Sequence, residues 1–327
     1  MMRAWRVNEL GHPSTSLSLE SVQIPTPAAG QLRVRVVAGT INFADILLCQ
    51  GIYQDRPGVP FTPGLETFGV VDAVGDGVSI PVGARVAGMA ALPAGAFAEY
   101  ALLHAGSVLE FPASVPGPDA TVLFSTYQTA HVALHHRAHI QPTEWLLVHA
   151  GAGGVGSAAV QLGVAAGARV IATAGGAEKV ARCLAHGADH AIDYTTEDLY
   201  ERVMQLTDGH GADVVFDPVG GPVAAPSRRL MAWEGRLLVI GFASGDIPQH
   251  AANHILVKNY AIIGVHWGVY YRHGRAVIET AHADLLRLLG AGSIRPDVTE
   301  SVGLEAVPAM LEALEHRRIK GRVVLTP

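Results

Sequence analysis

A glycine-rich turn, Gly151-Ala152-Gly153-Gly154-Val155-Gly156, follows a continuous apolar run at 145–150 and opens a small-residue segment at 154–166. This is the G-x-G-x-x-G pattern in the context that it requires, with a strand before it and a helix after it. The first glycine makes the tight turn, the second lets the backbone approach a pyrophosphate, and the third lets helix and strand pack closely. Free N–H groups and the positive helix end would hold the diphosphate. The pattern predicts a dinucleotide site made by Gly151, Gly153, Gly154, Val155 and Gly156, with an ordinary tight turn as the simpler alternative.

The segments that follow this turn alternate between strand and helix. The expected strands are apolar throughout, as strands covered on both faces should be. Alternating β and α units of this length predict a parallel, doubly wound sheet with right-handed crossovers and helices on both faces. The expected strands are 145–150, 169–174, 191–193, 213–216 and 236–240, and the expected helices are 154–166, 178–186 and 199–206.

The chain before about residue 120 has a different character. Short β-like runs at 32–37, 69–74, 84–87 and 98–102 alternate with glycine and proline. Closely spaced short strands of this kind favour a compact, β-rich barrel. The segment 42–50 is the expected short helix of this half. After about residue 264 we expect helices at 282–289 and 304–316 and a last strand at 323–326.

Composition and charge exclude several classes of protein. Hydrophobic residues make up 49% and charged residues 16% of the chain, which suits a well-buried globular enzyme. The net charge of −6 indicates neither nucleic acid nor an anionic membrane as a partner. No apolar run is long enough to span a membrane, and residues 1–10 lack the apolar centre of a signal peptide. With Cys49 and Cys183 as the two cysteines, a disulfide framework is excluded and a cytoplasmic location is expected.

The end of the second expected strand bears on the choice of cofactor. NAD enzymes usually place Asp or Glu there, where the carboxylate binds the ribose hydroxyls. In this chain the stretch 173–176 has no carboxylate before Glu178, Lys179 follows, and Arg182 lies on the same helical face. Without the acid a 2′-phosphate is not repelled, and a nearby cation attracts it, so NADPH is favoured over NADH. The alternative is that Lys179 and Arg182 form only a solvated helix face.

Two signatures make the whole chain similar to the medium-chain dehydrogenase/reductase superfamily. The block Gly-Leu-Glu-Thr-Phe-Gly-Val-Val at 64–71 resembles its G-H-E-x-x-G-x-V signature, and the glycine turn has the form His-Ala-Gly-Ala-Gly-Gly-Val-Gly at 149–156. The resemblance implies an α/β architecture, with a GroES-like β-barrel-type catalytic domain at 1–122 and 266–327. A Rossmann domain at 123–265 would complete it, with the cofactor in the cleft. The resemblance also implies a homodimer formed by Rossmann sheets that join edge to edge, with 260–265 as the candidate edge strand.

The departures from the zinc-dependent members of this superfamily concern the metal. Those enzymes supply a histidine ligand in the first block and a cysteine in a C-x-x-D-like segment, whereas this chain has Leu65 and Asn42 there. Leucine cannot bind zinc, asparagine is a poor replacement for thiolate, and two cysteines are too few for a structural zinc lobe. We therefore expect no metal site and no zinc. Without that Lewis acid, the remaining acceptors are quinones and activated alkenes.

The segments 42–45 and 51–53 are similar to the quinone oxidoreductase branch, and this resemblance implies the site residues. Asn42 and Tyr53 would line the nicotinamide pocket, and Thr126 would contact the nicotinamide carboxamide. Lys179 and Tyr194 would sit at the adenosine 2′-phosphate, with Gly175 in the turn after the second strand. The cofactor site would also include Gly241, Phe242, Ala243 and Ser244, which border the nicotinamide, and Arg322 of the closing strand.

The expected chemistry is hydride transfer from C4 of NADPH to an electron-poor acceptor, with positioning as the main contribution of the protein. Asn42 would donate a hydrogen bond to a developing oxyanion, and Tyr53 would do likewise or relay a proton. The simpler alternatives are a helix N-cap for Asn42 and a proline-packed turn aromatic for Tyr53. His131 and His135 have the i, i+4 spacing of a metal pair, although a helix C-terminus also accounts for histidines.

Three functions fit these residues. The first is a quinone reductase acting on a small molecule. The second is an enone or enoyl-thioester reductase, which shares the motifs and differs in pocket shape, with Arg56, Arg272 and Arg275 available for a pantetheine group. The third is a non-catalytic NADPH-binding protein, against which intact Asn42 and Tyr53 argue.

Overall fold

The computed structural model describes residues 1–316, 318–319 and 321–327, and the chain divides into two compact units. Unit 1 consists of Met1–Ser125 and Pro296–Pro327, and unit 2 of Thr126–Arg295. Unit 1 is therefore assembled from both ends of the sequence, and unit 2 is one continuous stretch between them.

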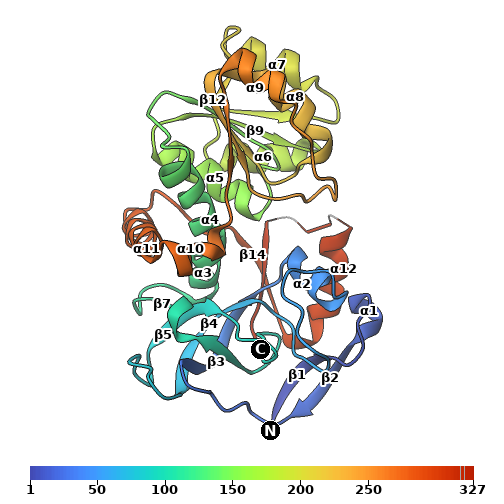
Figure 1. The fold of residues 1–327 in the computed structure, drawn as a ribbon, viewed down its shortest axis with the longest axis vertical. Helices are drawn as coiled ribbons and strands as arrows, with labels where there is room; N and C mark the ends of the chain where they lie inside the picture. The colour runs from blue at the N-terminus through green and yellow to red at the C-terminus, as the bar shows by residue number, and fades with distance from the viewer. Residues whose placement is uncertain (317, 320) are drawn as a thin grey trace. The chain divides into compact units, whose positions relative to one another are not determined.

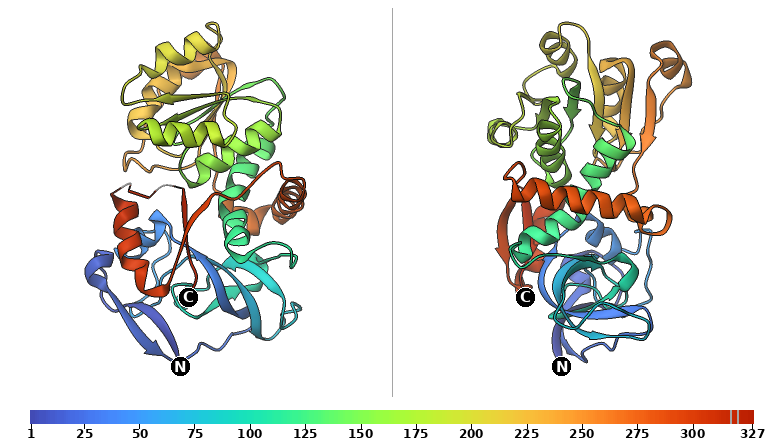
Figure 2. Two further views of the ribbon diagram at one scale, coloured as in Figure 1. Left: turned by 180° about the vertical axis from the view of Figure 1, so that it is seen from behind. Right: turned by 90° about the vertical axis from the view of Figure 1, so that its left-hand side faces the viewer.

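Unit 2 is built on a parallel sheet with strand order β10-β9-β8-β11-β12-β13 (Figure 1). This is the 3-2-1-4-5-6 order of dinucleotide-binding sheets, in which the winding reverses between the first and fourth strands. Figure 2 shows helices on both sides of the sheet. The predicted doubly wound parallel sheet is thus confirmed. Its strands are β8 (Trp145–Val148), β9 (Arg169–Ala174), β10 (His190–Asp193), β11 (Ala212–Asp217), β12 (Met231–Val239) and β13 (Ala261–Gly264).

The helices of unit 2 follow the strands in the expected alternation. The predicted helix at 199–206 has the observed bounds, and the helices predicted at 154–166 and 178–186 are shifted by no more than a residue. The helical elements are α4 (Gln128–His131), η3 (Val132–Arg137), α5 (Gly154–Ala165), α6 (Ala177–Ala185), α7 (Leu199–Leu206), η4 (Gly221–Val223), α8 (Ala224–Leu230), α9 (Ala252–Lys258), η5 (Trp267–Val269), α10 (Tyr270–His273) and α11 (Arg275–Gly290).

An aliphatic row across the sheet forms the core of unit 2. Leu147, Ile171, Val215 and Leu237 are paired in register on β8, β9, β11 and β12, and all four are fully buried. Such continuous apolar strands fix the register of a parallel sheet, because both of its faces are covered. The carboxyl ends of the strands consequently meet at one edge, where their loops form the candidate site.

The segment 266–295 differs from the predicted boundary, because it lies in unit 2 and not with the catalytic domain. Trp267 Nε1 donates to Gln128 Oε1 at 3.0 Å, and His131 Nε2 lies 3.2 Å from Asp284 Oδ2. These bonds join α11 and the turn before it to the helical stretch that opens unit 2. A pairing between helices so far apart in sequence cannot be read from the pattern of either helix alone.

Unit 1 holds a sheet with strand order β14-β15-β3-β4-β5-β7, and β6 pairs with β3. Its neighbours are antiparallel except for β14 and β15, and β1 pairs with β2 in a separate ribbon. The predicted β-rich unit, completed by the C-terminal strand, is confirmed. Its elements are β1 (Met2–Val7), α1 (Pro13–Ser16), β2 (Leu17–Val22), β3 (Gln31–Thr40), α2 (Phe43–Cys49), β4 (Glu66–Val74), β5 (Arg85–Met89), β6 (Tyr100–His104), η1 (Ala105–Ser107), β7 (Leu109–Glu110), α3 (Gly117–Val122), η2 (Leu123–Tyr127), β14 (Val298–Val302), η6 (Leu304–Ala306), α12 (Val307–Glu315) and β15 (Arg322–Leu325).

The core of this β-rich unit is made by alternate residues of the strands. Val34, Val71, Val86 and Leu103 are buried together, while Arg33 and Asp72 form an ion pair of 2.9 Å on the solvated side. This alternation is typical of antiparallel sheets with one covered face. Among the described residues, the helices are too short or too polar to cross a bilayer.

Candidate active site

The glycine turn after β8 has no room for side chains at its first and last glycines. An ideal Cβ at Gly156 would lie 2.1 Å from Ala150 O, and one at Gly151 would lie 2.7 Å from Ala172 Cβ. At Gly153 the nearest atom to such a Cβ would be Ala150 O at 3.2 Å. The turn is therefore held tightly by Gly151 and Gly156, and the glycine between them leaves the backbone approachable. This arrangement fits a bound diphosphate at the start of α5.

The turn after β9 brings together three residues that the sequence assigned to the 2′-phosphate. A Cβ at Gly175 would lie 2.7 Å from Tyr194 Oη, so the Tyr194 ring lies directly against the glycine. Lys179 is half-buried in the first turn of α6, and its backbone N–H donates to Gly176 O at 3.1 Å. Unit 2 thus places Gly175, Lys179 and Tyr194 at the ends of two neighbouring strands.

The loop after β12 packs against the loop after β11 at the same edge of the sheet. It contains the predicted residues Gly241, Phe242, Ala243 and Ser244. Ala243 N donates to Pro218 O at 3.1 Å, and a Cβ at Gly221 would lie 2.6 Å from Ser244 Oγ. Phe242 is 40% exposed. The loop is anchored by its backbone and offers an aromatic side chain to solvent.

In unit 1, the Asn42 amide is held at both ends. Its Oδ1 accepts from Arg322 Nη2 at 2.6 Å, and its Nδ2 donates to Thr40 Oγ1 at 3.0 Å and to Glu66 Oε1 at 2.8 Å. An amide nitrogen carries two hydrogens, and both are used here. The geometry therefore disfavours Asn42 as a donor to a developing oxyanion. Arg322 is likewise engaged with the Asn42 side chain.

Two carboxylates and one guanidinium meet around this amide. Asp45 is fully buried and accepts from the backbone N–H groups of Asn42 at 2.8 Å and Leu65 at 3.1 Å. Burial raises the pKa of Asp45 to about 7, although the two N–H donors lower it. Burial also raises the pKa of Glu66, and the Arg322 guanidinium opposes that rise. The cluster holds more acid than base, so it favours retaining a proton near neutral pH.

Tyr53 and Thr126 were also predicted to face the nicotinamide. Tyr53 is half-buried and packs against a cluster that includes Leu48, Cys49 and Phe61, and burial raises its pKa. Thr126 is buried in the π-helical turn η2, and its Oγ1 has no hydrogen-bond partner among the described residues. A buried hydroxyl without a partner is costly, and it fits a donor or acceptor reserved for a ligand.

The two positions that hold zinc ligands in other members of the superfamily have different contacts here. Leu65 belongs to the apolar cluster of Tyr53, and Asn42 bonds to Glu66 and Arg322. The His131 ring lies against that of His135, tilted by 40° with 4.4 Å between centroids, and it pairs with Asp284. Within the described ranges, no three His, Cys, Asp or Glu side chains are grouped so that they could hold a metal ion.

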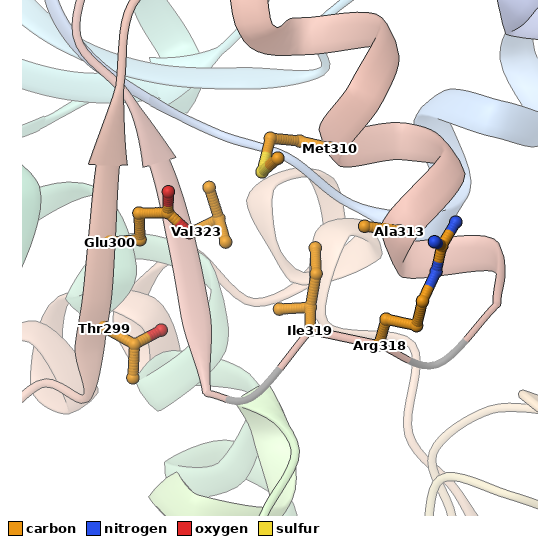
Figure 3. A pocket seen from close by; sticks show the side chains of 7 residues that line it. All are labelled: Thr299, Glu300, Met310, Ala313, Arg318, Ile319 and Val323. Carbon is orange, nitrogen blue, oxygen red and sulfur yellow. The ribbon is translucent and has the colours of Figure 1, made fainter.

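A cavity of about 290 Å³ lies elsewhere in unit 1, between α12 and the strands β14 and β15 (Figure 3). None of the predicted site residues lines it. Val323 points into this cavity, whereas its neighbour Arg322 bonds to Asn42, as successive strand residues point to opposite faces. The cavity is lined by Thr299, Glu300, Met310, Ala313, Arg318, Ile319 and Val323.

Sequence reasoning missed three acids that organise these sites. Asp45 lies in the segment 42–45 and Glu66 in the block 64–71, both of which carried a resemblance, and Asp193 directly precedes Tyr194. Each was visible as a carboxylate beside a residue already singled out. Their roles depend on contacts with distant residues, such as Arg322 for Glu66, and those contacts leave no local signal.

Together, the sheet order and the glycine turn place the chain in the class of dinucleotide-binding α/β proteins. Residues 28–113 match the family model of the alcohol dehydrogenase GroES-like domain, and residues 154–285 match that of zinc-binding dehydrogenases. The quinone oxidoreductase-like protein 2 homolog of Nematostella vectensis is 38% identical over 329 residues, which is 99% of this chain and 88% of that protein.

Solved structures agree with this match. The Escherichia coli quinone oxidoreductase complexed with NADPH is 30% identical and has a TM-score of 0.91, over 99% of this chain and 100% of that one. The CurK enoyl reductase is 26% identical and has a TM-score of 0.87, over 99% of each chain. The chain belongs to the medium-chain dehydrogenase/reductase family, in its quinone oxidoreductase-like branch, and the predicted resemblance is confirmed.

Proposed function

We propose that this chain is an NADPH-dependent reductase that transfers a hydride to a quinone or a similar electron-poor acceptor without zinc. The observation that carries the proposal is the glycine turn, where a side chain at Gly156 would collide with Ala150 O and α5 begins two residues earlier. Such a turn suits a dinucleotide diphosphate. The relative from Escherichia coli, solved with NADPH, supports the choice of cofactor.

Several residues of this chain favour NADPH over NADH. The turn after β9 carries no acidic side chain at Gly175 or Gly176, and Lys179 follows in the first turn of α6. Tyr194 lies against Gly175 and is 54% exposed, so its ring can cover one side of an adenosine phosphate. A cation beside a turn that has no acidic side chain of its own attracts a 2′-phosphate, which NADH lacks.

When bound, NADPH supplies a hydride from C4 of its nicotinamide, and one proton completes the reduction of a quinone to a hydroquinone. The phenol of Tyr53 is protonated at neutral pH and can hydrogen-bond to the developing oxyanion or relay a proton to it, while burial raises its pKa and so disfavours a lasting tyrosinate. Asn42 would line the acceptor site with its amide held in place by Arg322 and Glu66. Thr126 Oγ1 remains available to the carboxamide.

A second candidate is reduction of an enone or an enoyl thioester. The likeness to the CurK enoyl reductase favours it, and the same residues would serve. Arg56, Arg272 and Arg275 remain candidates for a pantetheine-bearing substrate. In this case Tyr53 would protonate the carbon next to the carbonyl group, after hydride addition to the other alkene carbon.

The test is NADPH oxidation by chelator-treated protein, with a naphthoquinone and an enone assayed side by side and NADH as the control cofactor. Turnover of the quinone with NADPH preferred supports the main proposal. Turnover of the enone alone selects the second candidate, and binding of NADPH with no turnover selects a non-catalytic binding protein. Tyr53→Phe is the matched variant, since it removes the phenolic hydroxyl group and keeps the ring. Activity that returns only on adding zinc contradicts the zinc-free proposal.

We also propose a cytoplasmic homodimer. β13 stands at the end of the sheet order of unit 2, with Trp233 64% exposed on β12 beside it in the sheet order and Leu256 75% exposed on α9. A strand edge next to exposed apolar side chains suits pairing with a second copy.

A further inference from the structure

Asp193, the last residue of β10, holds the turn that follows the neighbouring strand. Its Oδ1 accepts from Gly176 N at 2.9 Å, from Thr195 N at 3.0 Å and from Thr195 Oγ1 at 2.6 Å. All three bonds converge on one oxygen. These donors lower the pKa of Asp193, so the carboxylate is ionised at neutral pH.

Gly176 is the N-cap residue of α6, directly before its first residue Ala177. Its φ of +88° lies in the left-handed region, and a carboxylate bond to its N–H fixes this unusual backbone conformation. Its carbonyl in turn accepts from Lys179 N at 3.1 Å. Asp193 therefore fixes the start of the helix turn that carries Lys179.

The residue after Asp193 is Tyr194, whose N–H donates to Ala174 O at 3.2 Å. Its ring lies against Gly175, where a Cβ would be 2.7 Å from Oη. One aspartate thus joins the β9–α6 turn to the end of β10, and these two segments carry Gly175, Lys179 and Tyr194.

We propose that Asp193 is a positioning residue that sets the preference for NADPH over NADH. It would do so by holding Gly176, and through it the start of the helix that carries Lys179, beside the end of β10 that carries Tyr194. The inference rests on the proposed function, because it assigns a role to Asp193 in the 2′-phosphate site. A carboxylate near a phosphate would ordinarily repel it. Here Oδ1 is turned toward three donors of the two turns, so the acid holds the turn instead of binding ribose hydroxyls.

The test compares Asp193→Ala and Asp193→Asn with Asp189→Ala. Asp189 is a matched control, because its Oδ2 accepts from Val170 N at 2.7 Å at the opposite end of the same two strands. The first readout is the ratio of kcat/KM for NADPH to that for NADH. The second is calorimetric binding of adenosine 2′-monophosphate against adenosine 5′-monophosphate, which does not depend on turnover. Thermal unfolding of each variant measures the purely structural effect.

We expect Asp193→Ala to lower the NADPH/NADH ratio about tenfold or more, since a hydrogen bond to a charged group is lost. Asp193→Asn keeps a neutral acceptor, so the ratio should fall less, by about threefold. Asp189→Ala should leave the ratio unchanged while its melting temperature falls. Binding of adenosine 2′-monophosphate should weaken in step with the ratio.

A ratio in Asp193→Ala within about twofold of the wild type, or an equal fall in Asp189→Ala, overturns the inference. If Asp193→Ala does not fold, Asp193→Asn is compared with Asp189→Asn instead. A ratio about threefold lower in Asp193→Asn alone supports the inference, and equal ratios in the two variants overturn it. A wild-type protein that prefers NADH defeats the proposed cofactor itself. A wild-type preference for NADPH that survives in the Asp193 variants defeats only the role of Asp193.

Discussion

Replacement of Gly156 by alanine tests the glycine turn most directly. The added Cβ would lie 2.1 Å from Ala150 O, 2.8 Å from Ala150 C and 3.0 Å from Gly151 Cα. An ordinary carbon–oxygen contact is about 3.3 Å, so helix and turn must separate by about 1.2 Å. The obstructing atoms are backbone atoms of the turn itself, which no change of rotamer can move.

The cost follows from this displacement. Overpacking of a tight site costs about 1–3 kcal/mol, and an obstruction made of backbone belongs to the upper part of that range. For a unit of this size, each kcal/mol lowers the melting temperature by about 2–4 °C, so we expect a fall of roughly 5–10 °C. Misplacing binding groups by about 1 Å can cost up to about 100-fold, and NADPH affinity should therefore fall at least tenfold.

The measurement combines thermal unfolding with fluorescence titration of NADPH, and Gly153→Ala is the matched control. A Cβ at Gly153 would have its closest neighbour, Ala150 O, at 3.2 Å, and the φ of −84° suits any residue. Gly153→Ala should therefore keep most of its stability and lose affinity, because the methyl group blocks approach of the pyrophosphate. Wild-type stability and affinity in Gly156→Ala would refute the reasoning.

Three further predictions follow from other parts of the molecule. Burial raises the pKa of Asp45 from 3.8 to about 7, so the native state binds an extra proton between these values and stability falls as pH rises through them. Urea midpoints should therefore fall between about pH 4 and pH 7, and a fall of equal size in Asp45→Asn would contradict this origin. Lys179→Ala should raise KM for NADPH about tenfold and leave KM for NADH nearly constant in steady-state assays, and equal losses for both cofactors would reduce Lys179 to a solvated helix residue. Ile262→Pro should convert the proposed dimer to a monomer in light scattering, because proline removes a strand donor, and an unchanged mass would place the interface elsewhere.

Much of unit 2 could be predicted from the sequence because its signals are local. Apolar runs, glycine positions and helix periodicity each act over a few residues, and they located β8, β9 and α7 within two residues of the observed bounds. Gly151 and Gly156 were assigned to tight packing from the motif, and both are obstructed as expected.

The parts that escaped prediction depend on distant partners. The Asn42 amide is oriented by Arg322, which is 280 residues away in sequence, and both of its N–H donors are used by Thr40 and Glu66, which disfavours the predicted bond to an oxyanion. His131 and Asp284 are 153 residues apart in sequence, and their pairing joins α11 to the first helical stretch of unit 2. Asp193 is visible in the sequence, but its bond to Gly176 depends on the register between β9 and β10.

The discontinuity of unit 1 affects how the protein can fold while it is synthesised on the ribosome. β3 receives β15 as a neighbour, Val324 opposite Thr40, and β15 in turn pairs with β14. All strands of the unit 2 sheet are synthesised before either C-terminal strand emerges. Domains tend to fold as units during synthesis, so unit 2 can fold early. The sheet of unit 1 keeps an unpaired edge on β3 until β15 has been synthesised. During that interval, the end of β3 at Gly39 and Thr40 lacks its partner and can pair wrongly, whereas β6 already covers residues 31–35.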